Sequence, residues 1–319
     1  MTTKTSLNST KCSSEYTSMI EKSNVDSISL AGNSSKINTY FSFCSKKQLT
    51  IFKLIEKAFN KKELEYIKDI YFNLLEEEKL LMKKLRFNYM QLQPDINSEM
   101  RAILIDWLIS VHLKFRLKPE TLYQTVYLID AYLSNSYIKR NELQLLGITA
   151  LFIAAKFNEI YYPKIDEFVN ITDNAYKKSD VLSMEINIFK VLTFDIFLPN
   201  HLDFFNIISK CFSFDDVTHN LGLYFMESSL LNDLLIQYPP SVIALACAYI
   251  VMKFFNIKNY HLLYSNNMLK HECPQKIIKE VARQICHLVK FLTGSSYTAI
   301  KDKYASEYYK KVSLICESK

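Results

Sequence analysis

Glycine is almost absent from this chain. Only four of the 319 residues are glycine: Gly32, Gly147, Gly222 and Gly294. Folds rich in β-strands pass through many tight turns, and phosphate-binding loops place several glycines together, because glycine adopts backbone conformations that other residues avoid. The sequence therefore argues against both kinds of structure.

Apolar residues follow helical spacing through most of the chain. A short amphipathic segment covers 48–61, and apolar residues alternate with charges at i, i+3 and i+4 over 63–85. The segments 100–115 and 143–157 are apolar nearly all round, which is typical of a helix at the centre of a bundle or covered by a partner on a second face. We therefore predict an all-α protein.

Prolines and internal similarity divide the helical part into two halves. Leu198-Pro199-Asn200 marks a boundary, because proline cannot continue a helix and asparagine caps the next one. The IAAKF and KVLT segments of the first half are echoed by IVMKF and KFLT in the second. The expected divisions are a disordered Ser/Thr/Asn-rich tail over 1–47, an N-terminal helical segment over 48–97, and two helical domains over 98–197 and 198–313.

Composition excludes several classes of function. The seven cysteines contain no C-x-x-C pair, and the six histidines form no recognisable triad or zinc set, so we expect no catalysis, metal or cofactor. The net charge of +6 contains no run of five basic residues that would mark a nucleic-acid patch. With no apolar run long enough for a signal peptide or a membrane span, we expect an intracellular protein that binds neither membranes nor nucleic acid.

Charged residues interrupt the apolar helices. Arg101, Asp106 and Lys156 lie in stretches that leave no room for a polar face, and Asp130 and Glu185 are similar. A buried charge without a partner is costly, so these residues should pair within the chain or meet a partner protein. From the pattern alone, both interpretations stay open.

Motifs in a fixed order resemble the cyclin family, and most of all its B-type, G2/mitotic-specific members. MRAILIDWL at 100–108, HLKF at 112–115, AKFNEIY at 155–161 and YPPS at 238–241 look like cyclin-box motifs, within a resemblance that covers about residues 63–313. It implies two tandem five-helix cyclin boxes after an N-terminal helix. It also implies a regulatory subunit of nucleus and cytoplasm that activates a cyclin-dependent protein kinase at entry into mitosis, by positioning the kinase αC helix.

The resemblance also assigns site residues. The kinase-binding residues that it implies are Lys156, Glu185, Ile153, Phe157, Phe194, Ile196, Tyr66 and Ile70. A groove that docks Arg-x-Leu peptides of substrates or inhibitors is implied at Met100, Ile103, Leu104, Trp107, Leu143 and Gln144, with Ser110 at the position where A-type cyclins carry an acid. By its spacing alone, a stripe such as Met100, Ile103, Leu104 and Trp107 is core. Arg101 and Asp130 resemble an internal structural ion pair.

Two other proteins with a double cyclin fold provide the alternative interpretation. Transcription factor IIB would need an N-terminal zinc ribbon, which Cys12 and Cys44 cannot supply. Transcriptional cyclins lack the B-type pattern around His112 and Phe115. The chain also departs from mitotic cyclins, because no arginine precedes Arg86 and the tail therefore has no Arg-x-x-Leu destruction box.

Overall fold

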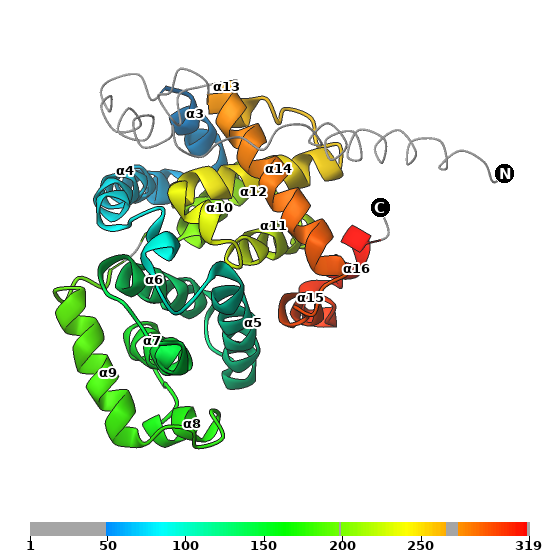
Figure 1. Ribbon diagram of the computed structural model, residues 1–319. Coiled ribbons are helices and arrows are strands. Elements are labelled where there is room, and N and C mark those ends of the chain that lie inside the picture. The colour runs from blue at the N-terminus through cyan, green and yellow to red at the C-terminus, as the bar shows by residue number, and fades with distance from the viewer. Residues whose placement is uncertain (1–48, 198, 266–273, 318–319) are drawn as a thin grey trace.

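The computed structural model describes residues 49–197, 199–265 and 274–317, and every regular element within these ranges is a helix (Figure 1). The prediction of an all-α protein is confirmed. The disordered tail expected over 1–47 lies outside the described residues.

An N-terminal segment precedes the two domains and consists of α3 (Leu49–Ala58), α4 (Lys61–Lys84) and the short η2 (Tyr89–Leu92). Asn60 caps α4 by accepting hydrogen bonds from the backbone N–H groups of Lys62 and Glu63, while the Glu63 carboxylate accepts one from the Asn60 N–H. The buried positions of α4 follow helical spacing, so one face of this helix packs on the rest of the protein.

The first domain contains five α-helices: α5 (Ser98–Phe115), α6 (Pro119–Asn135), α7 (Leu143–Asn158), α8 (Ile165–Asn170) and α9 (Lys178–Val191), with η3 (Arg140–Glu142) before α7. Nearly every residue of α6 and α7 is buried, so these two helices form its centre. Helices α5 and α7 approach closely at Gly147, where a Cβ atom would lie 2.7 Å from Cδ1 of Leu104.

The second domain begins with a capped helix. Asn200 caps its first helix by accepting hydrogen bonds from the backbone of Leu202 and Asp203. Its elements are α10 (His201–Cys211), α11 (Asp216–Ser229), η4 (Asp233–Gln237), α12 (Pro240–Phe254), α13 (Leu262–Ser265), α14 (Pro274–Thr293), α15 (Ala299–Tyr304), η5 (Glu307–Tyr309) and α16 (Val312–Glu317). The echoed segments end α7 and α12, and α9 and α14.

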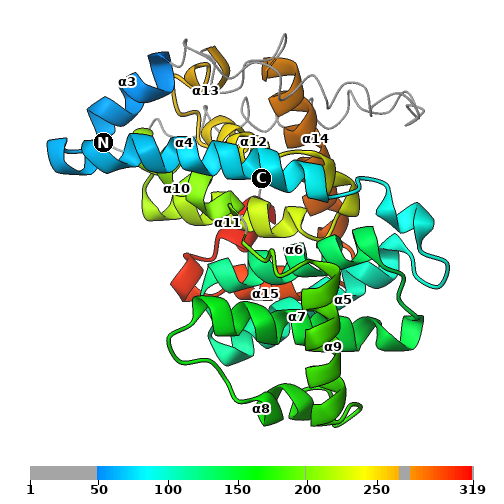
Figure 2. The same cartoon turned by 90° about the vertical axis from the view of Figure 1, so that its left-hand side faces the viewer.

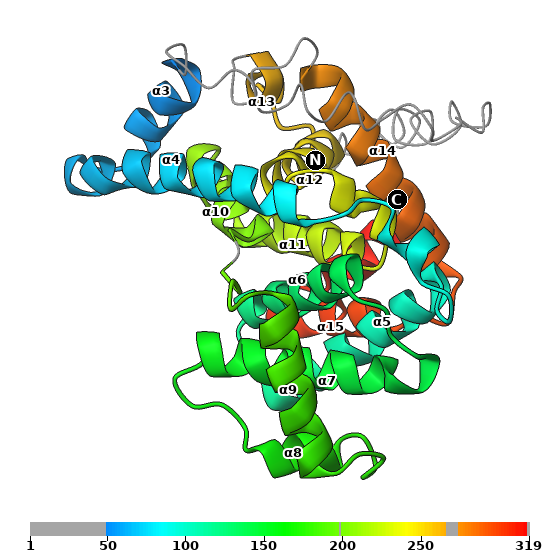
Figure 3. The ribbon, with the colours of Figure 1, turned by 60° about the vertical axis from the view of Figure 1, so that its left-hand side comes forward.

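The two domains meet along α5. This helix packs against α7 on one side and against α15 of the second domain on another, which explains why it is apolar nearly all round. The carboxylate of Asp106 accepts a hydrogen bond of 3.2 Å from the backbone N–H of Ala299 in α15. Figures 2 and 3 show α4 running past α10 and α12 of the second domain towards the first.

Candidate functional site

Lys156 and Glu185, two of the kinase-binding residues that the resemblance implies, pair with each other within the chain. The Lys156 ammonium, near the end of α7, makes an ion pair with the Glu185 carboxylate on α9, and it lies 4.3 Å from the ring centroid of Phe152. In the chain alone the pair is partly buried, with side-chain exposures of 32% for Lys156 and 12% for Glu185. A lysine ammonium has three donors, so this pair leaves capacity for further acceptors.

Large apolar side chains lie on the surface of the same two helices and of the turns that follow them. Phe157 lies in the last turn of α7, Ile186 lies on α9, and Phe194 follows α9 with 74% of its area exposed. Exposed apolar side chains that gather on rigid elements are typical of protein–protein contact surfaces. We call Lys156, Glu185, Phe157, Ile186 and Phe194 the α7/α9 surface.

A strained turn holds Phe194 on this surface. Thr193 and Phe194 have φ angles of 50° and 60°, in the left-handed region that bulky residues rarely adopt. The backbone N–H of Phe194 donates to the carbonyl of Phe189, and the rings of these two phenylalanines stack at a centroid distance of 5.4 Å. The turn therefore fixes the direction of an exposed aromatic side chain.

A hydrogen-bond chain ties this turn to the end of α7. The Gln124 side chain on α6 donates to the backbone carbonyl of Ile196 and accepts from the Asn158 side chain, at 3.0 and 2.6 Å. Asp195, next to Phe194, makes an ion pair with Lys84 at the end of α4. The ends of three helices are thus held together beside the α7/α9 surface.

The remaining residues that the sequence assigns to kinase binding are placed differently. Ile153 is fully buried in the core of the first domain, and Ile196 is partly buried. Tyr66 and Ile70 are exposed on α4, but Ile70 precedes Lys84 by 14 residues, which corresponds to about 21 Å of helix. Those assigned residues that reach the surface therefore lie in two separate patches, one on α4 and one at the ends of α7 and α9.

The predicted docking groove is only partly at the surface. Ile103 is 54% exposed on α5, Ser110 is exposed, and Met100, Trp107 and Gln144 are partly buried. Leu104 and Leu143 are buried, because the close approach of α5 and α7 at Gly147 encloses this side of the stripe. The stripe is thus core on the Leu104 side and surface on the Ile103 side.

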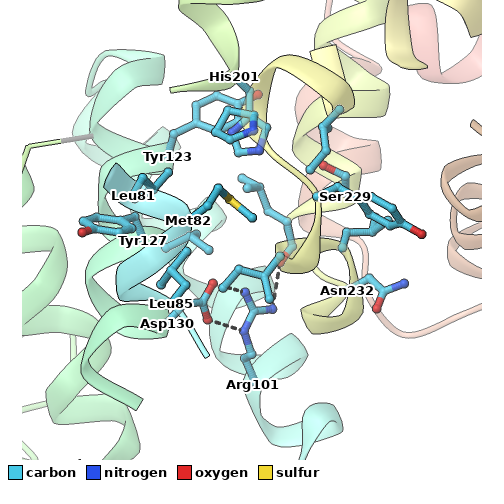
Figure 4. A pocket seen from close by; sticks show the side chains of 17 residues that line it. Leu81, Met82, Leu85, Arg101, Tyr123, Tyr127, Asp130, His201, Ser229 and Asn232 are labelled. Carbon is cyan, nitrogen blue, oxygen red and sulfur yellow. Dashed lines mark hydrogen bonds and ion pairs between the residues drawn. The ribbon is translucent and has the colours of Figure 1, made fainter. Parts of the chain in front are cut away.

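Arg101 and Asp130 form the ion pair that the sequence predicts, at the junction of the domains (Figure 4). The guanidinium Nε and Nη2 donate to the two Asp130 oxygens at 2.7 and 2.6 Å, and Nη1 donates to the Leu230 carbonyl of the second domain at 2.9 Å. The Tyr89 hydroxyl also donates to Asp130 at 2.7 Å. Both charges are buried and hydrogen-bonded within the chain, as expected of a structural ion pair.

A cavity of about 60 Å³ lies beside this ion pair, lined by α4, α6 and the second domain (Figure 4). Tyr123 and His201 form another part of its wall, with ring centroids 5.2 Å apart. Burial lowers the pKa of His201 to about 4, so the imidazole is neutral at pH 7. Most of the other lining side chains are apolar.

Two buried polar contacts were not predicted from the sequence. Lys303 on α15 donates to both oxygens of Glu227 on α11 at 2.7 Å, deep in the second domain. Glu78 on α4 accepts hydrogen bonds from the backbone N–H and the hydroxyl of Ser241 on α12. The sequence contained one sign of the Glu78 contact, because a glutamate occupies a position of α4 where helical spacing favours an apolar residue.

Other kinds of site find no support among the described residues. No cluster of three or more His, Cys, Asp or Glu side chains there could hold a metal ion. None of the described helices has the length and apolar content needed to cross a membrane.

Comparison with known proteins relates these features to a family. A family model described as the cyclin N-terminal domain matches residues 69–197, and one described as the cyclin C-terminal domain matches residues 199–318. A G2/mitotic-specific cyclin-B of Hydra vulgaris is 38% identical over 257 residues, covering 80% of this chain and 69% of that protein. A G2/mitotic-specific cyclin-B2 of Homo sapiens is 39% identical over 257 residues, covering 79% of this chain and 62% of that protein.

A solved structure agrees with the fold. The structure of a viral cyclin from herpesvirus saimiri superimposes with a TM-score of 0.58 at 16% identity, covering 69% of this chain and 97% of that one. The two domains are therefore tandem cyclin boxes. The chain belongs to the cyclin family, and B-type, G2/mitotic-specific cyclins are among its relatives.

Proposed function

We propose that this chain is a regulatory subunit that binds and activates a cyclin-dependent protein kinase at entry into mitosis, in the nucleus and cytoplasm. Cyclins are regulatory, non-catalytic proteins, and the relatives reported above are named as G2/mitotic-specific cyclins. The observation that carries the proposal is the α7/α9 surface, where a partly buried ion pair lies among exposed apolar side chains.

The chemistry of this surface suits a protein partner. Covering Phe157 and Phe194 removes a large apolar area from water, which is the main favourable term in most protein association. Lys156 has free donor capacity for carbonyl groups of the partner backbone, and Glu185 holds its ammonium in place. In the proposed complex these residues lie against the kinase αC helix and hold the αC glutamate close to the catalytic lysine, an arrangement that kinase catalysis requires.

Lys156→Ala tests this proposal. The variant should bind the kinase at least about 30-fold more weakly, because truncating one member of an interfacial, hydrogen-bonded charge pair costs about 2–5 kcal/mol. Binding is measured by isothermal titration calorimetry with a cyclin-dependent kinase. Lys178→Ala is the matched control, since Lys178 makes an exposed ion pair of 3.7 Å with Asp166 in the same domain. Unchanged affinity of Lys156→Ala would contradict the assigned role, and a variant that does not fold would mean that the pair serves only the chain itself.

We further propose that the surface side of the α5 stripe docks short Arg-x-Leu-type peptides of substrates or inhibitors. Ile103 supplies exposed apolar area for a leucine, and Trp107 lies beside it on the same helix. Ser110 carries no charge for the peptide arginine, so binding should be modest.

Fluorescence of Trp107, the single tryptophan of the chain, reports on this docking. An Arg-x-Leu-type peptide should shift the emission to the blue and saturate, and Ile103→Ala should weaken binding without loss of kinase activation. Ser110→Glu should tighten binding about tenfold or more, because a hydrogen bond to a charged group contributes about 1.5–3 kcal/mol. A flat titration in both the native chain and Ser110→Glu would show that the stripe serves only the core.

A further inference from the structure

Helix α4 joins the cores of both cyclin boxes. Before Glu78, Tyr71 and Leu75 pack into the core of the second box, where the ring centroid of Tyr71 lies 6.1 Å from that of Phe204. After Glu78, Leu81 and the C-cap residue Leu85 pack into the core of the first box. Figures 2 and 3 show the helix passing α10 and α12 of the second box, with its C-terminal end nearest the first box. The position of α4 is therefore set by both boxes at once.

Glu78 lies between these two groups of residues, on the buried face of α4. Tyr71, Leu75, Met82 and Leu85 lie on the same face, and Glu78 takes a position that the spacing would give to an apolar residue. Only 3% of Glu78 is exposed. A carboxylate at such a place is costly unless specific partners compensate its burial, so its contacts define where α4 can lie.

The partners of Glu78 are the first free donors of α12. This helix opens with Pro239 and Pro240, which have no backbone N–H, and Pro239 provides no side-chain cap. The N–H and the hydroxyl of Ser241 donate to the two Glu78 oxygens at 2.7 and 2.8 Å. A side chain from another helix thus caps α12; burial raises the pKa of this carboxyl to about 7, while the two hydrogen bonds from Ser241 act to lower it.

Two ion pairs near the ends of α4 are weaker guides to its position. Glu63 pairs with Lys210 on α10, and Lys84 pairs with Asp195. All four side chains are about 40% exposed, and exposed ion pairs contribute little because water and salt screen them. A shift of α4 by one helical turn, about 5.4 Å, would break both Glu78 hydrogen bonds and leave a buried carboxylate unpaired.

We propose that Glu78 is a positioning residue for kinase binding: by capping α12 it fixes the register of α4 across the two boxes and so orients Tyr66 and Ile70 towards the kinase. These two side chains are exposed on the outer side of α4, 12 and 8 residues before Glu78. The inference rests on the proposed function, because it assumes that a kinase contacts this part of α4.

A double-mutant cycle separates this role from general stability. Glu78→Leu removes the cap and should weaken kinase binding about tenfold in the native background. The loss should again be about tenfold in the Lys156→Ala background, because Lys156 lies on a different part of the interface. In a Tyr66→Ala/Ile70→Ala background, the same change should weaken binding less than about twofold, because the contacts that Glu78 positions are already gone. Equal losses in all three backgrounds would overturn the proposal.

Milder variants keep the test informative if Glu78→Leu fails to fold. Glu78→Gln retains one oxygen acceptor for the Ser241 N–H and should bind the kinase more tightly than Glu78→Leu. Ser241→Ala removes only the hydroxyl donor and should show the same pattern across the three backgrounds, with smaller losses. Uniform losses for Ser241→Ala, or a Glu78→Gln variant that binds no better than Glu78→Leu, would contradict the capping role.

Hydrogen exchange of the kinase-free chain distinguishes failure of this inference from failure of the proposed function. In Glu78→Gln or Ser241→Ala, amides of α4 and of the first turn of α12 should exchange faster than in the native chain, while those of α7 keep their protection. If the native chain binds no kinase, the proposed function fails, and the exchange pattern still tests the register of α4. Unchanged exchange in α4 would overturn the inference.

Discussion

Asp130→Ala should be among the most damaging single changes in this protein. The Asp130 carboxylate accepts two hydrogen bonds from the Arg101 guanidinium and one from the Tyr89 hydroxyl. Without it, the buried guanidinium keeps only the Leu230 carbonyl as an acceptor, and arginine cannot discharge by losing a proton. The change therefore leaves an uncompensated charge at the junction of the two cyclin boxes.

The expected loss is about 4 kcal/mol of the free energy of unfolding, because breaking a buried ion pair costs about 3–5 kcal/mol. Urea unfolding followed by Trp107 fluorescence measures it, since Trp107 lies on α5 together with Arg101. Replacing both charges, with Arg101→Met and Asp130→Leu, should recover at least about half of the loss, because no unpaired charge remains.

Lys178→Ala is the matched control for this experiment. Lys178 and Asp166 make an exposed ion pair in the same box, with side-chain exposures of 55% and 67%. Its loss should change stability by less than about 0.5 kcal/mol. A loss of less than about 1 kcal/mol for Asp130→Ala, or a double variant worse than the single one, would refute this reasoning.

Three further changes test the packing and electrostatics of the second box by the same urea assay. Gly222→Ala should cost about 1–3 kcal/mol, because the added Cβ would lie 2.0 Å from Cζ of Phe205; no measurable loss would contradict that close packing. Glu227→Ala should cost about 3–5 kcal/mol, because it strands the buried Lys303 ammonium; a near-neutral change would be evidence against a buried charge there. The pKa of His201 is about 4 when folded and 6.5 when unfolded, so the free energy of unfolding falls as the pH drops from 6.5 towards 4, by about 2 kcal/mol at pH 5. His201→Phe should remove this part of the pH dependence of stability, and identical pH profiles for the variant and the native chain would contradict it.

Local signals predicted the helices well. Asn200, Pro199 and the Tyr238-Pro239-Pro240 segment give helix boundaries within a few residues of those observed, because capping and the missing proline N–H act on the nearest turn. The internal echo likewise predicted two similar domains, since repeated core positions impose repeated sequence.

Contacts between distant segments were harder to predict. Glu78 and Ser241 are 163 residues apart, and Lys303 and Glu227 are 76 apart, so no local spacing relates them. The burial of individual site residues also depends on the neighbouring helix. Leu104 is buried because Gly147 lets α7 approach α5 closely, and the spacing of apolar residues in α5 does not predict this contact. Lys156, by contrast, is partly exposed because it lies in the last turn of α7.

Stimulation of a purified cyclin-dependent kinase tests the central claim most directly. The initial rate of phosphate transfer to a histone-type substrate is measured as this chain is titrated into the kinase, with the native chain and Lys156→Ala in parallel and the chain alone as the blank. Binding through the α7/α9 surface predicts a saturable rise in rate with the native chain, a curve for Lys156→Ala displaced to at least about 30-fold higher concentration, and no rate for the chain alone. A native chain that leaves the rate of every cyclin-dependent kinase of its source organism unchanged would contradict the proposed function.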